Sequence, residues 1–348
     1  MNSVQVLVPC YNYGRYLREC VGSILSQNGV DVSVLIIDDC STDDTPQVCD
    51  EIMRADSRVN VIRHPVNKGH IATYNEGIAL ISSEYFVLIS ADDLLTPGAL
   101  LRATELMAAH PSVGLVYGHP VSFQGETPPA ARTAVSGWSV WPGKDWIQLV
   151  CESGKNFIIS PEAVMRTSIQ KSLGGYDPRL PHSGDMEMWL RAAAISDVGW
   201  VGGADQAYYR VHTSSMQRTV HAGFLFDLEG RRKAFRSAFS KEAGQVDGAD
   251  QLREAARHSL ALTAIQHARR VQDSGKTKLD PPEAYCRFAS SLHPKVVQSK
   301  IWRAVQRNRA GGKGLPGRPA RRLRSVIREV MDRLAWRRWW RTGIFMPR

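Results

Sequence analysis

Three apolar runs that end abruptly in polar or acidic residues constrain the fold of this chain more than any other feature. They occupy residues 4–12 (VQVLVPCYN), 32–45 (VSVLIIDDCSTDDT) and 85–93 (YFVLISADD). Runs rich in Val, Ile and Leu are typical of strands buried on both faces of a parallel sheet. Because β-α-β crossovers are right-handed, successive strand ends meet at one edge, where ligand sites of open α/β sheets lie. The pattern predicts a mostly parallel α/β sheet with a site at this edge.

Segments with helical spacing separate these runs. We expect helices at residues 14–26, 42–54, 70–81, 96–109 and 184–194, and further strands at 59–64, 114–123 and 200–212. Residues 156–173 read as a strand followed by a helix. Residues 124–145, rich in Gly, Pro, Ser and Trp without a clear period, predict a mobile loop over the pocket. Three aromatic residues in or beside this segment are Trp138, Trp141 and Trp146. They either line a binding groove or pack the loop against the core, and we favour the packing role.

The chain changes character beyond Met216, where polar, Ala-rich and Arg-rich helical segments are broken by Pro and Gly. We therefore expect three parts: an α/β catalytic domain at residues 1–215, a helical extension at 216–310 and a basic, Trp/Arg-rich tail at 311–348.

Charge and composition limit the cellular setting. The formal net charge is +10, and residues 313–348 hold eleven basic residues against two acidic ones, so nearly all of the excess lies in the tail. We read no transmembrane helix and no secretion signal, and the six cysteines show no paired CxxC spacing. The expected localisation is cytoplasmic, peripheral on the inner face of the cytoplasmic membrane if the tail binds lipid.

The tail interleaves tryptophan with arginine in AWRRWWRTGIF (residues 335–345). This mixture suits a segment that lies in an anionic membrane interface, which is the partner we favour for residues 313–348. A solvated or partner-binding helix is the main alternative. Binding of nucleic acid through phosphate contacts is the least favoured reading.

The short motifs, taken in order, resemble the family 2 glycosyltransferases, which are inverting enzymes of the Rossmann-like GT-A fold that use nucleotide-activated sugars. The matching pieces are VPCYN (8–12), IIDDCSTDDT (36–45), NKGHIATYNEGI (67–78), SADDLLTPGAL (90–100), GGYDPRL (174–180), GDMEMWLR (184–191) and YRVH (209–212). The resemblance covers roughly residues 3–215 and does not extend to the tail.

The resemblance implies a set of residues that bind the nucleotide sugar: Pro9, Tyr11, Asn12, Asp39, Lys68, Asp92 and Arg210. Tyr11 would stack on the base, and Asp39 would accept a hydrogen bond from a uracil-type N3–H, which favours UDP. Asp92 would mainly contact the ribose. Lys68 and Arg210 would supply supporting positive charge.

The acid pair also matches the metal-binding motif of the family, so the implied cofactor is Mg²⁺ or Mn²⁺ bound to the diphosphate. Asp93 would hold the cation and His212 would assist, because such hard cations take oxygen ligands and keep several from water and phosphate. The family often has a third acid two residues before Asp92, whereas this chain has Ser90. Metal dependence therefore has to be measured.

Asp185 is the implied general base. Family members often carry two adjacent acids before this helix, and here Gly184 replaces the first. Inversion needs one displacement at the anomeric carbon, so a single carboxylate beside the acceptor suffices. Glu187 is the rival base or, with Trp189, an acceptor-binding or supporting residue.

These observations predict a metal-dependent inverting glycosyltransferase that moves a sugar from a nucleotide-diphosphate sugar to a saccharide or lipid-linked acceptor, in cell-envelope or extracellular polysaccharide biosynthesis. The alternative is a noncatalytic nucleotide-sugar-binding module that acts through its helical C-terminal half. The sequence names neither the sugar nor the acceptor.

Overall fold

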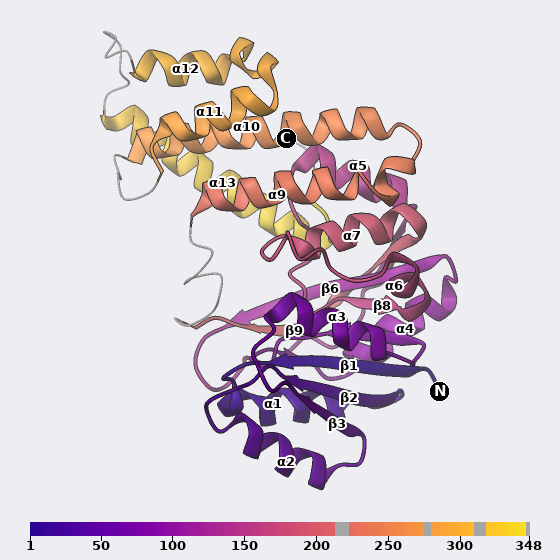
Figure 1. The fold of residues 1–348 in the computed structure, drawn as a ribbon. Helices are drawn as coiled ribbons and strands as arrows, with labels where there is room; N and C mark the ends of the chain where they lie inside the picture. The colour runs from indigo at the N-terminus through magenta and orange to yellow at the C-terminus, as the bar shows by residue number, and fades with distance from the viewer. Residues whose placement is uncertain (213–222, 275–279, 310–317, 346–348) are drawn as a thin grey trace. The chain divides into compact units, whose positions relative to one another are not determined.

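The computed structural model describes residues 1–212, 223–274, 280–309 and 318–345 (Figure 1). Contacts divide the chain into two compact units. The first comprises Met1–Trp146 and Ile158–Ser215, and the second Ile147–Phe157 and Met216–Arg348. Residues 147–157, which we expected in the first domain, therefore belong to the second unit. The expected extension and tail lie in one unit, and their expected boundary at residue 310 falls outside the described residues.

The first unit is built on a nine-stranded sheet with the order β3-β2-β1-β4-β8-β6-β9-β5, in which β7 also pairs with β9. Four neighbouring strands are parallel: β3 (Val59–Arg63), β2 (Asp31–Asp38), β1 (Ser3–Cys10) and β4 (Tyr85–Leu88). β8 (Val164–Arg166) is antiparallel to β4 and to β6 (Val113–Phe123), whereas β6 is parallel to β9 (Asp197–Arg210). β5 (Leu94–Leu95) is antiparallel to β9. The expected α/β class is confirmed.

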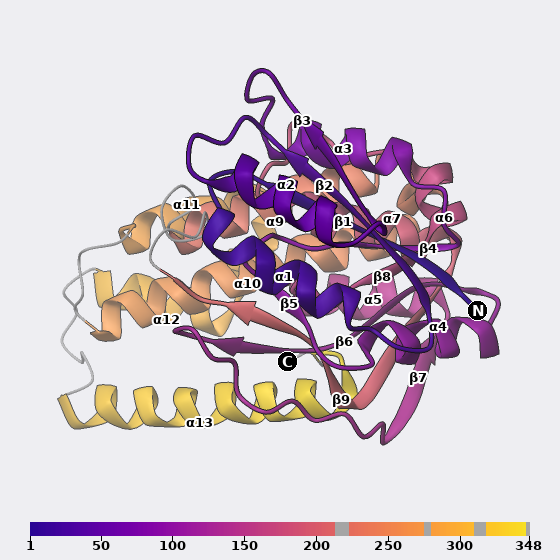
Figure 2. The same ribbon diagram turned by 90° about the horizontal axis from the view of Figure 1, so that it is seen from below.

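Helices cover both faces of the parallel half (Figures 1 and 2). The alternating residues Val4, Val6 and Val8 of β1 join a core cluster with α1 (Gly14–Leu25), α2 (Thr45–Ala55) and α4 (Ala99–Ala109). The alternate residue Leu7 meets Gly77 of α3 (His70–Leu80) on the opposite face, where an added Cβ would collide with the Leu7 side chain. Burial of both faces explains why these strands read as continuous apolar runs.

The ends of the first strands lie side by side, as predicted. Cys10 at the end of β1 is in register with Asp38 at the end of β2, and Leu7 is in register with Leu88 of β4. The backbone amide of Ile89, just beyond β4, donates to the carbonyl of Leu7. The acidic residues that follow β2 and β4 therefore leave the sheet at the same edge.

The prediction of a mobile loop at residues 124–145 is wrong for the second half of this segment. β7 (Gly137–Trp141) pairs antiparallel with β9, and α5 (Gly143–Ser153) begins two residues later. Trp146 is buried, and its indole N–H donates to the Tyr117 hydroxyl over 3.4 Å, while the Trp141 ring stacks on Tyr117. These two tryptophans pin the segment to the core, as we favoured, and Trp138 remains 40% exposed.

Two short helices complete the site-bearing part of the first unit: α6 (Thr167–Leu173) and α7 (Gly184–Ile195). Asn75 of α3 fastens the segment between them, because its amide donates to the carbonyl of Tyr176 (2.9 Å) and its carbonyl accepts from the Tyr176 amide (2.7 Å). These two hydrogen bonds hold the segment between α6 and α7 against α3.

The second unit is helical. It contains α9 (Phe224–Ala238), α10 (Ala249–Ser274), α11 (Pro282–Leu292), α12 (Lys300–Arg309) and α13 (Arg318–Thr342), with short 3₁₀ turns at Glu242–Gln245 and Pro294–Gln298. α10 is the central helix and contacts the other four. Among the described residues, none of the helices is both long and apolar enough to cross a membrane.

Candidate functional site

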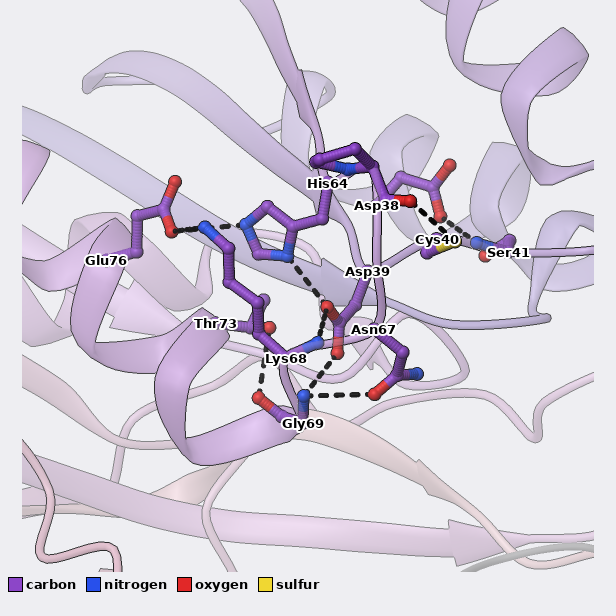
Figure 3. A network of polar contacts seen from close by, with 11 residues as sticks. Asp38, Asp39, Cys40, Ser41, His64, Asn67, Lys68, Gly69, Thr73 and Glu76 are labelled. Carbon is purple, nitrogen blue, oxygen red and sulfur yellow. Dashed lines mark hydrogen bonds and ion pairs between the residues drawn. The ribbon is translucent and has the colours of Figure 1, made fainter.

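Asp39, just beyond β2, is the centre of a polar network that orders the loop before α3 (Figure 3). One carboxylate oxygen accepts from Nδ1 of His64 and from the Lys68 amide, both at 2.7 Å, and the other accepts from the Gly69 amide at 2.9 Å. Burial alone would raise the pKa of Asp39, but these hydrogen bonds outweigh it and hold the pKa below its usual range. Asp39 is therefore an ionised acceptor.

The side chain of Lys68 extends the same network. Its ammonium group lies 2.7 Å from Glu76 Oε2, and the same oxygen lies 3.1 Å from Nε2 of His64. Lys68 is exposed, so it can still reach an anion at the strand edge, at the cost of its contact with Glu76.

Two non-glycine residues in left-handed conformations shape the turns after β1 and β2. Asn12 has φ 58° and Cys40 has φ 65°. The Asn12 amide donates to the Ser41 hydroxyl (2.9 Å), and its side-chain carbonyl accepts from the Thr42 amide (2.7 Å). Asp38 is buried and accepts from the Ser41 amide (3.0 Å), which gives it the role of a turn anchor. Asn12 thus ties the two strand ends together.

The acid pair after β4 is held by the end of β9. The Arg210 amide donates to Asp93 Oδ1 (2.9 Å), and its Nε donates to the Asp92 carbonyl (3.0 Å). The rest of the guanidinium reaches Glu19 (2.5 Å) and the Gly125 carbonyl (2.8 Å). Nε2 of His212 lies 2.8 Å from Asp92 Oδ2. All three side-chain nitrogens of Arg210 therefore have a partner in the protein, and two of its contacts position the acid pair.

The acid pair suits a cation that also binds a diphosphate. Burial, and then the charges of Asp92 and Glu162, raise the pKa of Asp93 well above its usual range. A bound cation would offset this repulsion, and carboxylate oxygens are ligands that Mg²⁺ and Mn²⁺ prefer. Among the described residues, however, no group of three His, Cys, Asp or Glu side chains could hold a metal ion by itself. Asp92, Asp93 and His212 fit an ion only if phosphate oxygens and water complete its coordination.

Asp185 opens α7 inside a small cluster of hydroxyl groups. The Ser160 hydroxyl donates to Asp185 Oδ2 over 2.6 Å, and the Tyr176 hydroxyl also hydrogen-bonds the carboxyl group. Burial raises the pKa of Asp185, and the two hydroxyl groups oppose that rise. Ser160 adopts φ 101°, a conformation that disfavours any residue with a Cβ. A carboxylate with a raised pKa is a stronger base than an exposed one.

Glu162 is a second buried carboxyl beside Asp185. One oxygen accepts from the Ile159 amide (2.7 Å), whereas Oε2 is buried and has no hydrogen-bond partner among the described residues. Burial, together with the charge of Asp185, raises the pKa of Glu162 to about 8. The charge of Glu162 in turn contributes to the raised pKa of Asp93, so Glu162 links the two acidic clusters electrostatically.

We expect Glu162→Gln to stabilise the protein at alkaline pH. A carboxyl whose folded pKa is about 8, against 4.5 unfolded, contributes stability that is complete below 4.5 and is lost as the pH rises to 8. Gln does not titrate, so the melting temperature of the variant should exceed that of the wild type by an amount that grows from pH 5 to pH 8 and then levels off. Thermal denaturation across this range measures it. A difference independent of pH would contradict the assignment.

The remaining predicted residues lie in two settings. Tyr11 is 47% exposed beyond β1, where it can meet a base, and Pro9 lies within β1 opposite Ile37. Glu187 is completely buried, 3.6 Å from Arg191, and Trp189 is also buried. The last two residues therefore belong to the packed interior of α7, which argues against their roles as rival base and acceptor contact.

Sequence reasoning missed four residues that complete these clusters: His64, Ser160, Glu162 and Tyr176. His64 ends a predicted strand, so its place beside the other strand ends was available as a signal. The other three lie in irregular segments and reach Asp185 or Asp93 only through tertiary contacts.

The sequence model of Glycosyl transferase family 2 matches residues 5–173. Glycosyltransferase GlyG of Streptococcus pneumoniae is 41% identical over 93 residues, which are 26% of this chain and 31% of that protein. A putative teichuronic acid biosynthesis glycosyltransferase of Bacillus subtilis, TuaG, is 27% identical over 125 residues, 36% of this chain and half of the relative. The matched segments thus span half or less of both relatives.

Two solved structures share the fold. Residues 1–349 of TarS from S. aureus, in complex with UDP-GlcNAc, match with a TM-score of 0.65 and 18% identity over 89% of this chain and 88% of that one. The mannosyltransferase PcManGT of Pyrobaculum calidifontis, in complex with GDP-Man and Mn²⁺, matches with a TM-score of 0.53 and 18% identity over 88% and 84%. At these identities the likeness shows the fold alone, and it confirms the GT-A-like arrangement.

Proposed function

Residues 5–173 belong to glycosyl transferase family 2, and on this premise we propose that the chain transfers a sugar with inversion from a UDP-sugar to a saccharide or lipid-linked acceptor. One observation carries the proposal. Glu162 and Tyr74 each interact electrostatically with Asp185, and both also with Asp93, so the implied base and the acid pair share one neighbourhood. Such a concentration of perturbed carboxyl groups is characteristic of active sites.

The donor would be held at the strand edge. Exposed Tyr11 offers a ring to the base. Within the described part of the chain, Oδ2 of Asp39 accepts only the Gly69 amide, so it can also accept a base N–H. Asp92 and His212 lie together as candidates for the ribose and diphosphate. A Mg²⁺ or Mn²⁺ ion bound by Asp93 with the diphosphate would stabilise the negative charge of the leaving group.

The chemical step assigned to this chain is one proton transfer. Asp185 accepts the proton of the acceptor hydroxyl as its oxygen attacks the anomeric carbon and the bond to the nucleotide diphosphate breaks. No covalent intermediate forms, so the configuration inverts. Ser160 and Tyr176 hold the carboxylate in place through their hydroxyl groups. The TuaG similarity supports a setting in the synthesis of a cell-envelope polymer, where a membrane-bound acceptor would be found.

Thermal shift with nucleotide sugars tests the donor assignment. A ligand that binds only the folded state raises the melting temperature. At a concentration 100 times its Kd, it adds about 2.7 kcal/mol to the free energy of unfolding. We expect UDP and UDP-sugars with Mn²⁺ to raise it more than GDP, CDP or ADP compounds. No shift with any UDP compound would overturn the donor assignment. Binding of a UDP-sugar without hydrolysis or transfer would favour the noncatalytic module instead.

A further inference from the structure

The helix α13 packs on its own unit through its charged residues. Arg324 and Arg328 lie 3.0 and 2.6 Å from the carboxylate of Asp273 on α10, and Asp332 lies 2.5 Å from Arg270 of the same helix. The Asp273 side chain is only 3% exposed, and hydrogen bonds from the two arginines help to lower its pKa. Between Arg324 and Asp332, the inner face of α13 is therefore an ionic one.

The outer face of α13 is apolar. Its central residues, spaced as neighbours on one side of a helix, are each between 49% and 56% exposed: Val326, Ile327, Val330, Met331 and Leu334. We call these five residues the outer apolar face. A surface helix of a globular protein normally turns its apolar side inward and its charges outward. α13 reverses that order, and a contiguous exposed apolar strip of this kind marks an interaction surface.

Positive charge lies beside this face. Arg333, Arg337, Arg338 and Arg341 are all exposed on the C-terminal half of α13, and Glu329 is the exposed acid among the described side chains of the helix. The tail as a whole carries eleven basic residues against two acidic ones. A partner that covers the face must therefore accept apolar side chains and carry negative charge.

The structure also revises the role expected for the Trp/Arg segment. Trp339 is buried, its indole N–H donates to the Phe157 carbonyl (3.2 Å), and its ring stacks on Phe345. Trp339 thus anchors α13 within the second unit. Trp336 and Trp340 remain 50% and 41% exposed near the end of the helix.

We propose that the outer apolar face of α13 docks on an anionic lipid bilayer, with its apolar side chains at the acyl boundary and its arginines among the headgroups. Two copies of this face would bring like charges together, which disfavours self-association. Nucleic acid would leave the apolar strip in water, because phosphates are bound by charge and hydrogen bonds. This inference goes beyond sugar transfer and does not depend on it.

Vesicle flotation of the full-length protein tests the proposal. We expect the wild type to float with vesicles of phosphatidylcholine and phosphatidylglycerol but not with phosphatidylcholine alone. The variant Ile327→Gln/Met331→Gln should lower the bound-to-free ratio by about tenfold or more, since two apolar side chains that would enter the acyl region are lost from the lipid contact. Val66→Gln/Leu80→Gln, which replaces two exposed apolar residues of the first unit, is the matched control and should float like the wild type.

Three results would overturn the proposal: no flotation of the wild type, equal flotation of the α13 variant, or a wild-type dimer in sedimentation that this variant alone dissociates. Circular dichroism of both variants verifies that they fold. Because no donor or acceptor is present, the outcome is independent of whether the chain transfers a sugar.

Discussion

Asp185→Asn is expected to lower the rate of sugar transfer by about 10²- to 10⁴-fold, the usual contribution of a general base. The amide preserves the size of the side chain but cannot take the proton of the acceptor hydroxyl. Initial rates with a UDP-sugar and its acceptor measure the effect. The affinity for the donor nucleotide, followed by thermal shift, should stay unchanged because Asp185 bonds Ser160 and Tyr176 and takes no part in the Asp39 network.

Two companion variants separate the base from its surroundings. Ser160→Ala removes a hydrogen bond that lowers the pKa of Asp185, so the acid limb of the rate profile should move to higher pH. Glu187→Gln alters a completely buried carboxyl two residues away and should cost stability without moving that limb. If Asp185→Asn kept the wild-type rate, the proton would have to go elsewhere, and the proposed mechanism would be wrong.

Asp93→Asn is expected to abolish most activity while sparing the fold. Loss of the cation-binding carboxylate should lower the transfer rate by at least about a hundredfold, since a metal supplies several kcal/mol of charge stabilisation. In the absence of cation the melting temperature should not fall. The amide still accepts from the Arg210 backbone, and it removes the repulsion from Asp92 and Glu162.

Metal titrations provide the readout for this second prediction. Mn²⁺ should raise the melting temperature of the wild type in the presence of UDP, and this increment should disappear in Asp93→Asn. Asp92→Asn is a useful comparison. Asp92 contacts His212, and we expect this substitution to weaken ribose binding more than cation binding. Full activity of the wild type in EDTA would contradict the proposed metal dependence.

Local sequence pattern predicted the parallel half of the sheet well. Apolar runs with β-branched residues marked β1, β2 and β4, and the acids that follow them lie at one edge, as expected from right-handed crossovers. The family resemblance is confirmed over residues 5–173. Short motifs at strand ends carry this information because the chemistry of the site and the turn geometry depend on the same few consecutive residues.

Segments without a period were predicted poorly. β7 lies in a stretch that reads as a loop, because its pairing with β9 joins residues about sixty positions apart. The assignment of residues 147–157 to the second unit likewise follows from distant contacts. The support that Arg210 gives to the acid pair was likewise not predictable, since only the folded chain brings its side chain to Glu19 and Gly125.

The sequence by itself determined the parallel strands and the candidate residues at their ends, since the order and spacing of the strand-end motifs are local properties of the chain. Tertiary structure alone decided how those residues are tuned. Asp39 is ionised because three donors from the loop before α3 surround it, and Glu162 has its raised pKa because packing buries it beside Asp185. The same holds for α13, whose apolar side became the outer one because buried Asp273 on α10 attracts its arginines. Solvation and charge pairing depend on neighbours that are distant in sequence, and they appear only once the chain has folded.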